Sequence, residues 1–124
     1  MISVRTFKIS LHENYCVADQ PKIDAHPQNT TKAEGDNVTL SCNATGNPVL
    51  AISWTRNGSL LITSGRISFS DDNKQLTITS VDRTDGGEYQ CVAKNNVGRD
   101  TSNAATLNVK CKIGGFLKNI LSRF

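Results

Sequence analysis

The stretch DRTDGGEYQC, residues 82 to 91, places an acid, a glycine, a phenol and a thiol at intervals of two residues. Side chains two residues apart lie on the same face of an extended strand. Asp85, Gly87, Tyr89 and Cys91 are therefore predicted to share one side of the chain. This row restricts the fold, because a helix would distribute the same four residues around its circumference.

Apolar and polar residues alternate with a period of two in short runs between residues 21 and 109, which is typical of half-buried strands. The residues predicted to face inward are Val38, Leu40, Cys42, Ala44, Ile52, Trp54, Ile67, Phe69, Leu76, Ile78, Val81, Tyr89, Cys91, Ala93, Ala105, Leu107 and Val109. Turn-forming residues such as Asn57-Gly58 separate the runs. Pro27 interrupts the first run, as expected of an edge strand that breaks or switches sheets. Short strands without a helical pattern between them predict an all-β antiparallel sandwich.

The net charge of +3 comes from the C-terminal end of the chain. Lys110, Lys112, Lys118 and Arg123 lie within the last fifteen residues, and the remainder holds ten basic and eleven acidic side chains. A nucleic-acid-binding protein needs a basic face with stacking aromatic residues. We therefore expect no nucleic-acid partner.

Four cysteines, at positions 16, 42, 91 and 111, form no C-x-x-C pair, and only His12 and His26 could complete a zinc site. Such scattered ligands do not indicate zinc, and no metal or cofactor is predicted. The cysteines favour disulfide bonds and hence an oxidising compartment. Residues 1–15 nevertheless lack the apolar core of a signal peptide, and no segment is long enough to span a membrane. The chain is expected either to come from a longer precursor or to be intracellular.

The flanks differ from the central pattern. Residues 1–20 are expected to be an N-terminal lead, residues 21–110 one domain, and residues 111–124 a basic amphipathic tail. The apolar residues at helical spacing in the tail are Phe116, Leu117, Ile120, Leu121 and Phe124. This short helix is interpreted either as a packing fragment or as a segment that touches a membrane or a partner.

Cys42 and Cys91 lie on inward faces of different predicted strands, and Trp54 follows the first cysteine by twelve residues. This combination resembles the immunoglobulin superfamily. The finer resemblance is to its intermediate, or I, set, and it covers residues 21–109 through PKIDAHP, EGDNVTLSCNATGNP, ISWTRNG, LTITSVDRTDGGEYQCVAKNNVG and ATLNV. The resemblance implies an immunoglobulin-like β-sandwich of Greek-key topology, whose two sheets are bridged by a Cys42–Cys91 disulfide that packs against Trp54.

The resemblance also assigns roles to the row in residues 82–91. Tyr89, two residues before the second cysteine, matches the tyrosine corner of the family, and Gly87 permits the bend before that strand. Asp85 matches an acid that pairs with an arginine opening strand D, and here the match is Arg66. These residues are therefore interpreted as structural residues that hold the sandwich together, and not as catalytic ones.

Motifs for catalysis are lacking from the sequence. It contains no serine beside a plausible base, no nucleophile elbow and no phosphate-binding glycine loop. The acidic pair Asp71-Asp72 is predicted to form a hairpin turn, and weak cation binding is the alternative. We predict that the chain is not an enzyme.

Four N-x-S/T sequons, at Asn29, Asn37, Asn43 and Asn57, predict glycosylation, which requires the secretory pathway; chance occurrence is the alternative. Asn37 and Asn43 point outward on one strand, which the resemblance places in a sheet of strands A, B, E and D. Glycans there would shield that sheet, so the partner face is expected on the sheet of strands C, F and G or on the loops at one end of the sandwich. The outward residues predicted for it are Ser53, Thr55, Glu88, Gln90, Val92, Lys94, Thr106 and Asn108.

This outward set lacks the aromatic anchors of a tight interface, so weak, multivalent protein contacts are expected, homophilic or heterophilic. The first interpretation is an extracellular or cell-surface recognition module, as in adhesion molecules, receptor ectodomains and matrix proteins. An intracellular structural module of the muscle type is the alternative. A secreted domain whose C-terminal helix touches membranes is the second. Cys16 and Cys111 are not expected to pair with each other, because the fold begins and ends at opposite poles. Each is expected to pair outside the core, with the tail, another domain or another chain.

Overall fold

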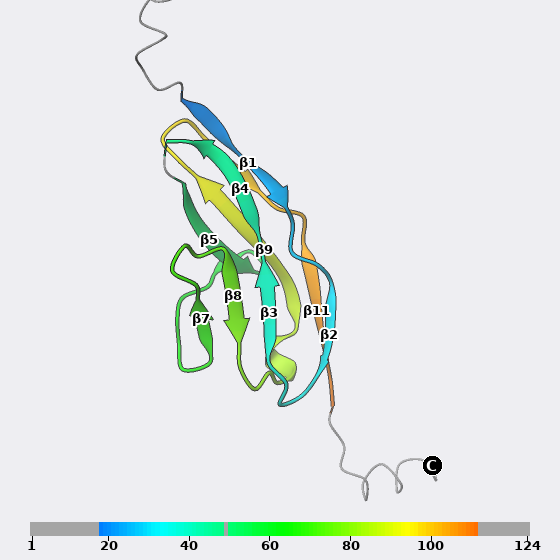
Figure 1. Ribbon diagram of the computed structural model, residues 1–124. Helices are drawn as coiled ribbons and strands as arrows, with labels where there is room; N and C mark the ends of the chain where they lie inside the picture. The colour runs from blue at the N-terminus through cyan, green and yellow to red at the C-terminus, as the bar shows by residue number, and fades with distance from the viewer. Residues whose placement is uncertain (1–17, 49, 112–124) are drawn as a thin grey trace, which may run out of the picture.

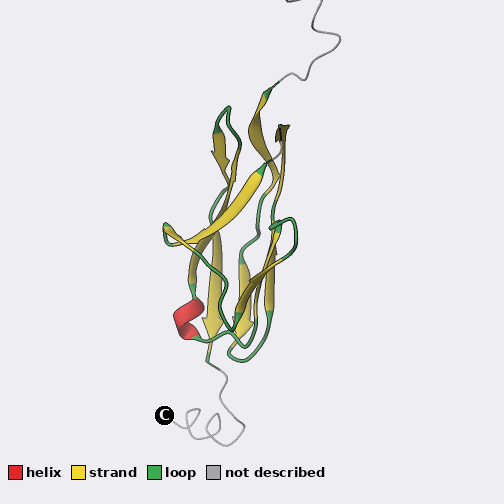
Figure 2. Ribbon diagram, turned by 90° about the vertical axis from the view of Figure 1, so that its left-hand side faces the viewer, coloured by secondary structure: helices red, strands yellow, loops and turns green. Residues whose placement is uncertain are grey.

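The computed structural model describes residues 18–48 and 50–111, which form a sandwich of two β-layers (Figures 1 and 2). The strands are β1 (Asp19–Ala25), β2 (Thr30–Ala33), β3 (Val38–Ser41), β4 (Asn43–Asn47), β5 (Ala51–Arg56), β6 (Ser59–Leu60), β7 (Ile67–Phe69), β8 (Gln75–Ile78), β9 (Gly87–Lys94), β10 (Arg99–Thr101) and β11 (Ala105–Lys110). A single 3-10 turn, η2 (Arg83–Asp85), precedes β9 and is the one helical element in this part of the chain. The prediction of an all-β fold is confirmed.

One layer has the strand order β2-β11-β9-β5-β6, with β10 also paired to β9. The other layer contains β3-β8-β7 and the pair β1-β4. β3 and β4 continue each other on either side of Cys42, whose N–H donates to the carbonyl of Lys74 (2.9 Å). All strand pairs are antiparallel except β2 and β11. This is the Greek-key sandwich that the resemblance implies.

The first strand predicted from the sequence is divided into β1 and β2, which lie in different layers. β1 pairs with β4, and after Pro27 the chain crosses to the layer of β9 and β5, where β2 runs parallel to β11. Proline has no backbone N–H and cannot continue a ladder of hydrogen bonds, and Pro27 is buried at the crossing. The prediction that this strand breaks or switches sheets is confirmed.

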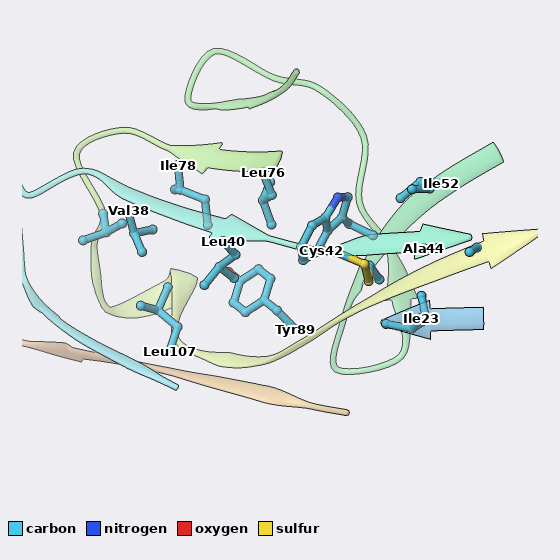
Figure 3. Close-up of a cluster of buried hydrophobic side chains, with 14 residues drawn as sticks. Ile23, Val38, Leu40, Cys42, Ala44, Ile52, Leu76, Ile78, Tyr89 and Leu107 are labelled. Carbon is cyan, nitrogen blue, oxygen red and sulfur yellow. A yellow bond between two sulfur atoms is a disulfide. The ribbon is translucent and has the colours of Figure 1, made fainter. Parts of the chain in front are cut away.

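The core between the layers is centred on a disulfide (Figure 3). Cys42 and Cys91 form the bond that joins the two layers, and Trp54 of β5 is fully buried in the same cluster. The Trp54 Nε1–H donates to the carbonyl of Asn73 (2.8 Å), and the Asn73 side chain donates to the carbonyl of Ile52 (3.2 Å). The turn between β7 and β8 therefore covers the outer edge of β5 beside the tryptophan.

The residues predicted to face inward are buried, with three differences. Ile67, Phe69 and Val109 are only partly buried, although they pack against the core. Ile67 and Phe69 belong to β7, which is the outer strand of its sheet and has a neighbour on one side only. A short edge strand covers the core less completely than a central one, which explains their exposure.

The described chain enters and leaves the sandwich at opposite poles, with the start of β1 at one end and the end of β11 at the other (Figure 1). Cys111 directly follows β11, and it is exposed with a free thiol. Cys16, the lead before residue 18 and the tail after residue 111, with its predicted helix, lie outside the described residues. Among the helical elements that the structure does describe, none has the length and apolar character to cross a membrane.

Candidate recognition face and its supporting bend

The bend before β9 is held by side chains of the row in residues 82–91. The Asp82 carboxylate accepts from the backbone N–H of Thr84 (2.8 Å), and the N–H of Asp82 donates to the Asp85 carboxylate (2.8 Å). These reciprocal bonds form a capping box around η2, an arrangement that fixes the start of a helical turn. The Tyr89 hydroxyl reaches back from β9 and donates to the backbone carbonyl of Asp85 (2.5 Å). The bend and the start of β9 are therefore fastened to each other.

Asp85 is buried, with 2% of its side chain exposed, and Arg66 compensates its charge. The Arg66 guanidinium donates to both carboxylate oxygens, at 2.7 and 3.1 Å, and also to the carbonyls of Thr79 and Ser80. Hydrogen bonding to Asp85 is the main cause that raises the pKa of Arg66 above its ordinary value. This bidentate, charge-assisted pair links the start of β7 to the bend.

Gly87 begins β9 with a φ of +150° and lies directly beneath the side chain of Asn57. A Cβ atom at Gly87 would come within 2.8 Å of both terminal atoms of the Asn57 amide. Asn57 is held there because its Oδ1 accepts from the N–H of Glu88 (2.9 Å). Glycine is needed at this position so that the two segments can approach.

Replacing Tyr89 by phenylalanine is expected to lower the free energy of unfolding by about 1 kcal/mol at neutral pH, because one buried hydrogen bond is lost. Burial raises the pKa of Tyr89 above its ordinary value of 10.0. The stabilisation linked to the protonated phenol is therefore fully present below about pH 10 and is lost as the pH rises through the folded-state pKa. Urea unfolding of both proteins from pH 7 to above pH 10 measures this. Equal loss of stability above pH 10 in both proteins would contradict the assignment.

The side-chain amides of all four sequon asparagines form hydrogen bonds with other parts of the domain. Three of them accept a backbone N–H through Oδ1: Asn29 from Thr106 (2.8 Å), Asn37 from Ser80 (3.0 Å) and Asn57 from Glu88 (2.9 Å). In these three, Nδ2, the atom that would carry an N-glycan, has no hydrogen bond to another described residue. Asn43 differs, because it is half-buried and its Nδ2 donates to the Asp24 carboxylate (2.8 Å).

The sequons divide between the two layers. Asn37 precedes β3 and Asn43 lies in β4, so both belong to the layer that contains β8 and β7. Asn29 and Asn57 border the other layer, because the two N–H groups that they accept belong to Glu88 and Thr106, which are paired across β9 and β11. Two sequons therefore flank one end of the predicted partner face.

The candidate site, called the recognition face, is the outward side of β5, β9, β10 and β11, which correspond to the strands that the resemblance labels C, F and G. It consists of Ser53, Thr55, Glu88, Gln90, Val92, Lys94, Arg99, Thr101, Thr106 and Asn108. Each of these residues is exposed or half-buried. The structure thus brings together the eight outward residues predicted from the sequence and adds Arg99 and Thr101 from β10.

Charge is unevenly distributed along this face. Glu88 lies near one end of β9 and Lys94 at the other end, where Arg99 is paired directly opposite Lys94. Lys94 and Arg99 are exposed, and neither forms an ion pair with a residue in the described ranges. Like charges directly opposite each other repel across a sheet. The face therefore has an acidic end and an unpaired basic end.

An apolar edge of this face was missed by the sequence reasoning. Leu60 and Ile62 have exposed fractions of 65% and 71%, and they are the most exposed of the large hydrophobic side chains described. Leu60 is paired with Thr55, and the N–H of Leu61 donates to the carbonyl of Trp54 (2.9 Å), so the pairing continues past β6. Leu61 packs against the core. The available signal was the run of three apolar residues, Leu60, Leu61 and Ile62, because a strand cannot turn all three to one face.

The acidic pair Asp71-Asp72 lies in the turn between β7 and β8, as predicted. Asp72 accepts from the Ser70 hydroxyl (2.7 Å) and from the N–H of Lys74 (3.0 Å). These bonds lower the pKa of Asp72. In the part of the chain that the structure describes, no group of three or more His, Cys, Asp or Glu residues is placed to hold a metal ion.

The disulfide, the buried tryptophan and the tyrosine corner between two Greek-key layers define an immunoglobulin-type β-sandwich domain. Residues 20–95 match the family described as "Immunoglobulin domain". The chain belongs to this family.

The relatives that the chain matches are much longer proteins. The chain is 40% identical to Neural cell adhesion molecule 1 of Homo sapiens over 85 residues, which cover 66% of this chain and 10% of that protein. It is 39% identical to Peroxidasin homolog pxn-2 of Caenorhabditis elegans over 104 residues, which cover 83% of this chain and 7% of that protein. The chain thus spans a tenth or less of these two relatives.

Two solved structures are similar in fold. The tandem Ig repeats of Dlar superpose with a TM-score of 0.72 at 33% identity, covering 77% of this chain and 51% of that one. A titin M10–obscurin-like 1 Ig complex gives a TM-score of 0.72 at 28% identity, covering 79% of this chain and all of that one. Because one domain family serves such different proteins, the function has to be argued from the surface.

Proposed function

We propose that this domain is a non-catalytic protein-recognition module of an extracellular or cell-surface protein. The observation that carries the proposal is the recognition face, an open side of a sheet with polar, apolar and unpaired charged groups. The buried polar groups Asp85 and Tyr89, by contrast, are engaged in holding the bend. Recognition is the activity that an exposed face of this kind supports, since a binding surface needs accessible groups and a rigid support.

An extracellular setting is supported by two features of the domain. The Cys42–Cys91 disulfide requires an oxidising compartment to form and persist. Asn29, Asn37 and Asn57 leave Nδ2 available for a glycan while Oδ1 holds the fold. The relative named Neural cell adhesion molecule 1 is consistent with the same setting.

An intracellular structural module is the second candidate, and the similarity to a titin domain favours it. Such a module would fold without the disulfide and would carry no glycans. Secretion in a eukaryotic cell followed by mass spectrometry of glycans and disulfides separates the two candidates. The second becomes preferred if the folded, disulfide-free domain is as stable as the oxidised one.

The chemistry of the face predicts weak contacts. It contains no Trp, Tyr or Phe, the residues that usually anchor tight interfaces. High overall binding affinity would then require several linked copies, since the first contact raises the effective concentration at which the second binding site meets its partner. The proposed partner of this domain is a protein. Contact with a membrane is proposed only through the parent protein or the C-terminal tail.

A glycan placed on the recognition face tests the proposal. The double substitution V92N/K94T creates a sequon at the centre of the face. The matched control T77N creates one on β8 in the opposite layer, because Thr79 already stands at the required position. The chain is multimerised and applied to an array of individually displayed cell-surface proteins, with the chain itself included. We expect V92N/K94T to lower binding at least about tenfold and T77N to leave it unchanged, because a glycan on one layer does not cover the other.

Mass spectrometry must show that both engineered sites carry glycans. Binding that disappears with T77N but persists with V92N/K94T would place the partner on the opposite layer. An array without any bound protein would remove the support for a recognition module.

A further inference from the structure

We infer that a second copy of this chain is a partner of the recognition face, docked in a two-fold arrangement with antiparallel strands. The inference rests on the proposed function and specifies the partner of the same face. It is carried by the distribution of charge along β9 and by the apolar edge formed by Leu60 and Ile62.

The charges on β9 are arranged so that the face complements itself. Glu88 and Lys94 lie three residues on either side of Cys91, and both side chains are exposed. Six residues of strand separate them by about 20 Å. A two-fold axis that crosses β9 near Cys91 reverses the strand direction in the second copy and brings its Lys94 onto Glu88 of the first. The same contact occurs twice, and Arg99 adds to the basic side of each.

The apolar edge obeys the same symmetry. Leu60 is paired with Thr55, which is paired with Gln90, so Leu60 lies on the row of Gln90. Continuing the ladder past Leu61 places Ile62 beside Ser53, on the row of Val92.

The axis that exchanges Glu88 with Lys94 also exchanges the rows of Gln90 and Val92. Leu60 of one copy therefore meets Ile62 of the other, and both exposed side chains leave water. Burial of apolar surface is the main driving force of such contacts.

The size of the face predicts a weak dimer. The face with its apolar edge is four strand positions wide, because β10 and β11 both pair with the same edge of β9. Four positions at roughly 4.8 Å and seven residues at roughly 3.3 Å cover about 440 Å² on each copy. A standard interface covers about 800 Å² on each partner. Self-association is thus expected at high local concentration, which is the situation of multiple copies on apposed surfaces.

The sequon at Asn57 lies at the acidic end of this contact. Because Asn57 accepts the N–H of Glu88, a glycan on Asn57 would stand beside the carboxylate that Lys94 must reach. Chains without a glycan at this position associate, and chains with one do not. Ser59→Ala removes the sequon and keeps the Asn57 side chain in place.

Sedimentation equilibrium of the full chain, produced without glycans in an oxidising bacterial compartment, tests the inference. Any free thiols are first alkylated with iodoacetamide, so that covalent dimers through Cys16 or Cys111 cannot form. Wild type is expected to dimerise reversibly at concentrations up to about 1 mM, where weak complexes are populated. E88K and K94E are each expected to weaken the dimer at least about tenfold, since like charges then meet twice. The double variant E88K/K94E restores association to within about threefold of wild type.

The matched control is K22E, a charge reversal of the same kind on an exposed residue of β1, which pairs with β4 in the opposite layer. It is expected to leave the dimer unchanged. R99E replaces K94E if the latter lowers the melting temperature of the domain. A wild type that stays monomeric throughout, or a double variant as weak as the single ones, overturns the inference.

The two proposals fail in different ways. Array binding to another protein that V92N/K94T abolishes, together with a monomeric wild type, overturns the second-copy inference alone. A monomeric wild type with no array binding at all overturns both.

Discussion

Replacing Cys42 and Cys91 together by alanine is expected to lower the free energy of unfolding by about 4 kcal/mol. The disulfide closes a loop whose ends are 49 residues apart, and a link of this length restricts the unfolded chain by roughly that amount. The free energy of unfolding of a small domain is about 5–15 kcal/mol, so the variant should be only marginally stable at 25 °C. Urea unfolding followed by Trp54 fluorescence measures the loss, because the indole is fully buried in the native protein.

Cys111→Ala is the matched control, because this cysteine is exposed and has a free thiol. It should leave the unfolding midpoint unchanged. Reductant should reproduce the effect of the double substitution in the wild-type chain. A midpoint that reductant does not move would show that the two layers hold together without the bond.

Replacing Asp85 by alanine is the second large effect, with an expected loss of about 3 kcal/mol. The change leaves the Arg66 guanidinium without its bidentate partner and removes the acceptor of the Asp82 N–H. The loss falls at the lower end of the range for buried pairs, because Arg66 itself is 39% exposed. Denaturant unfolding at neutral pH measures it.

The control for this change is Asp71→Ala, an acid on an exposed turn, which should alter stability by less than about 0.5 kcal/mol. A double-mutant cycle with Arg66→Ala isolates the pair itself. If Asp85→Ala costs the same in the presence and absence of Arg66, the stabilisation comes from the capping bonds of the bend and the longer contact with Arg56 (4.0 Å), and not from the Arg66 ion pair.

The sequence predicts most of the fold because the relevant signals are local. The alternation of apolar residues specifies which side chains face the core, and Pro27 specifies where the first strand changes layer, since a residue without an N–H cannot pair. The resemblance supplied the partner of Cys42, because alternation alone does not tell which strands lie opposite each other.

The parts that the sequence did not reveal depend on contacts between distant segments. Asn29 and Thr106 are 77 residues apart, yet one amide oxygen joins them. The capping of Ile52 by Asn73 across the sandwich edge is of the same kind. Arg99 and Lys94 lie close in the sequence, but whether they face each other depends on the register in which β10 pairs with β9. Such contacts follow from topology, and a single sequence carries no direct sign of them.

Under the proposed glycosylation, the sequon asparagines would serve both as glycan carriers and as hydrogen-bond acceptors of the fold, and this would constrain the descent of this gene. A lineage that discards the sugar by mutating Asn57 also discards the acceptor of the Glu88 N–H, whereas mutation of Ser59 discards the sugar alone. The same asymmetry separates Asn29 from Thr31. Drift away from glycosylation should therefore pass through the hydroxyl residue far more often than through the asparagine. A related sequence that keeps the asparagine but lacks the hydroxyl residue two positions later would then indicate an ancestor that was glycosylated at this position.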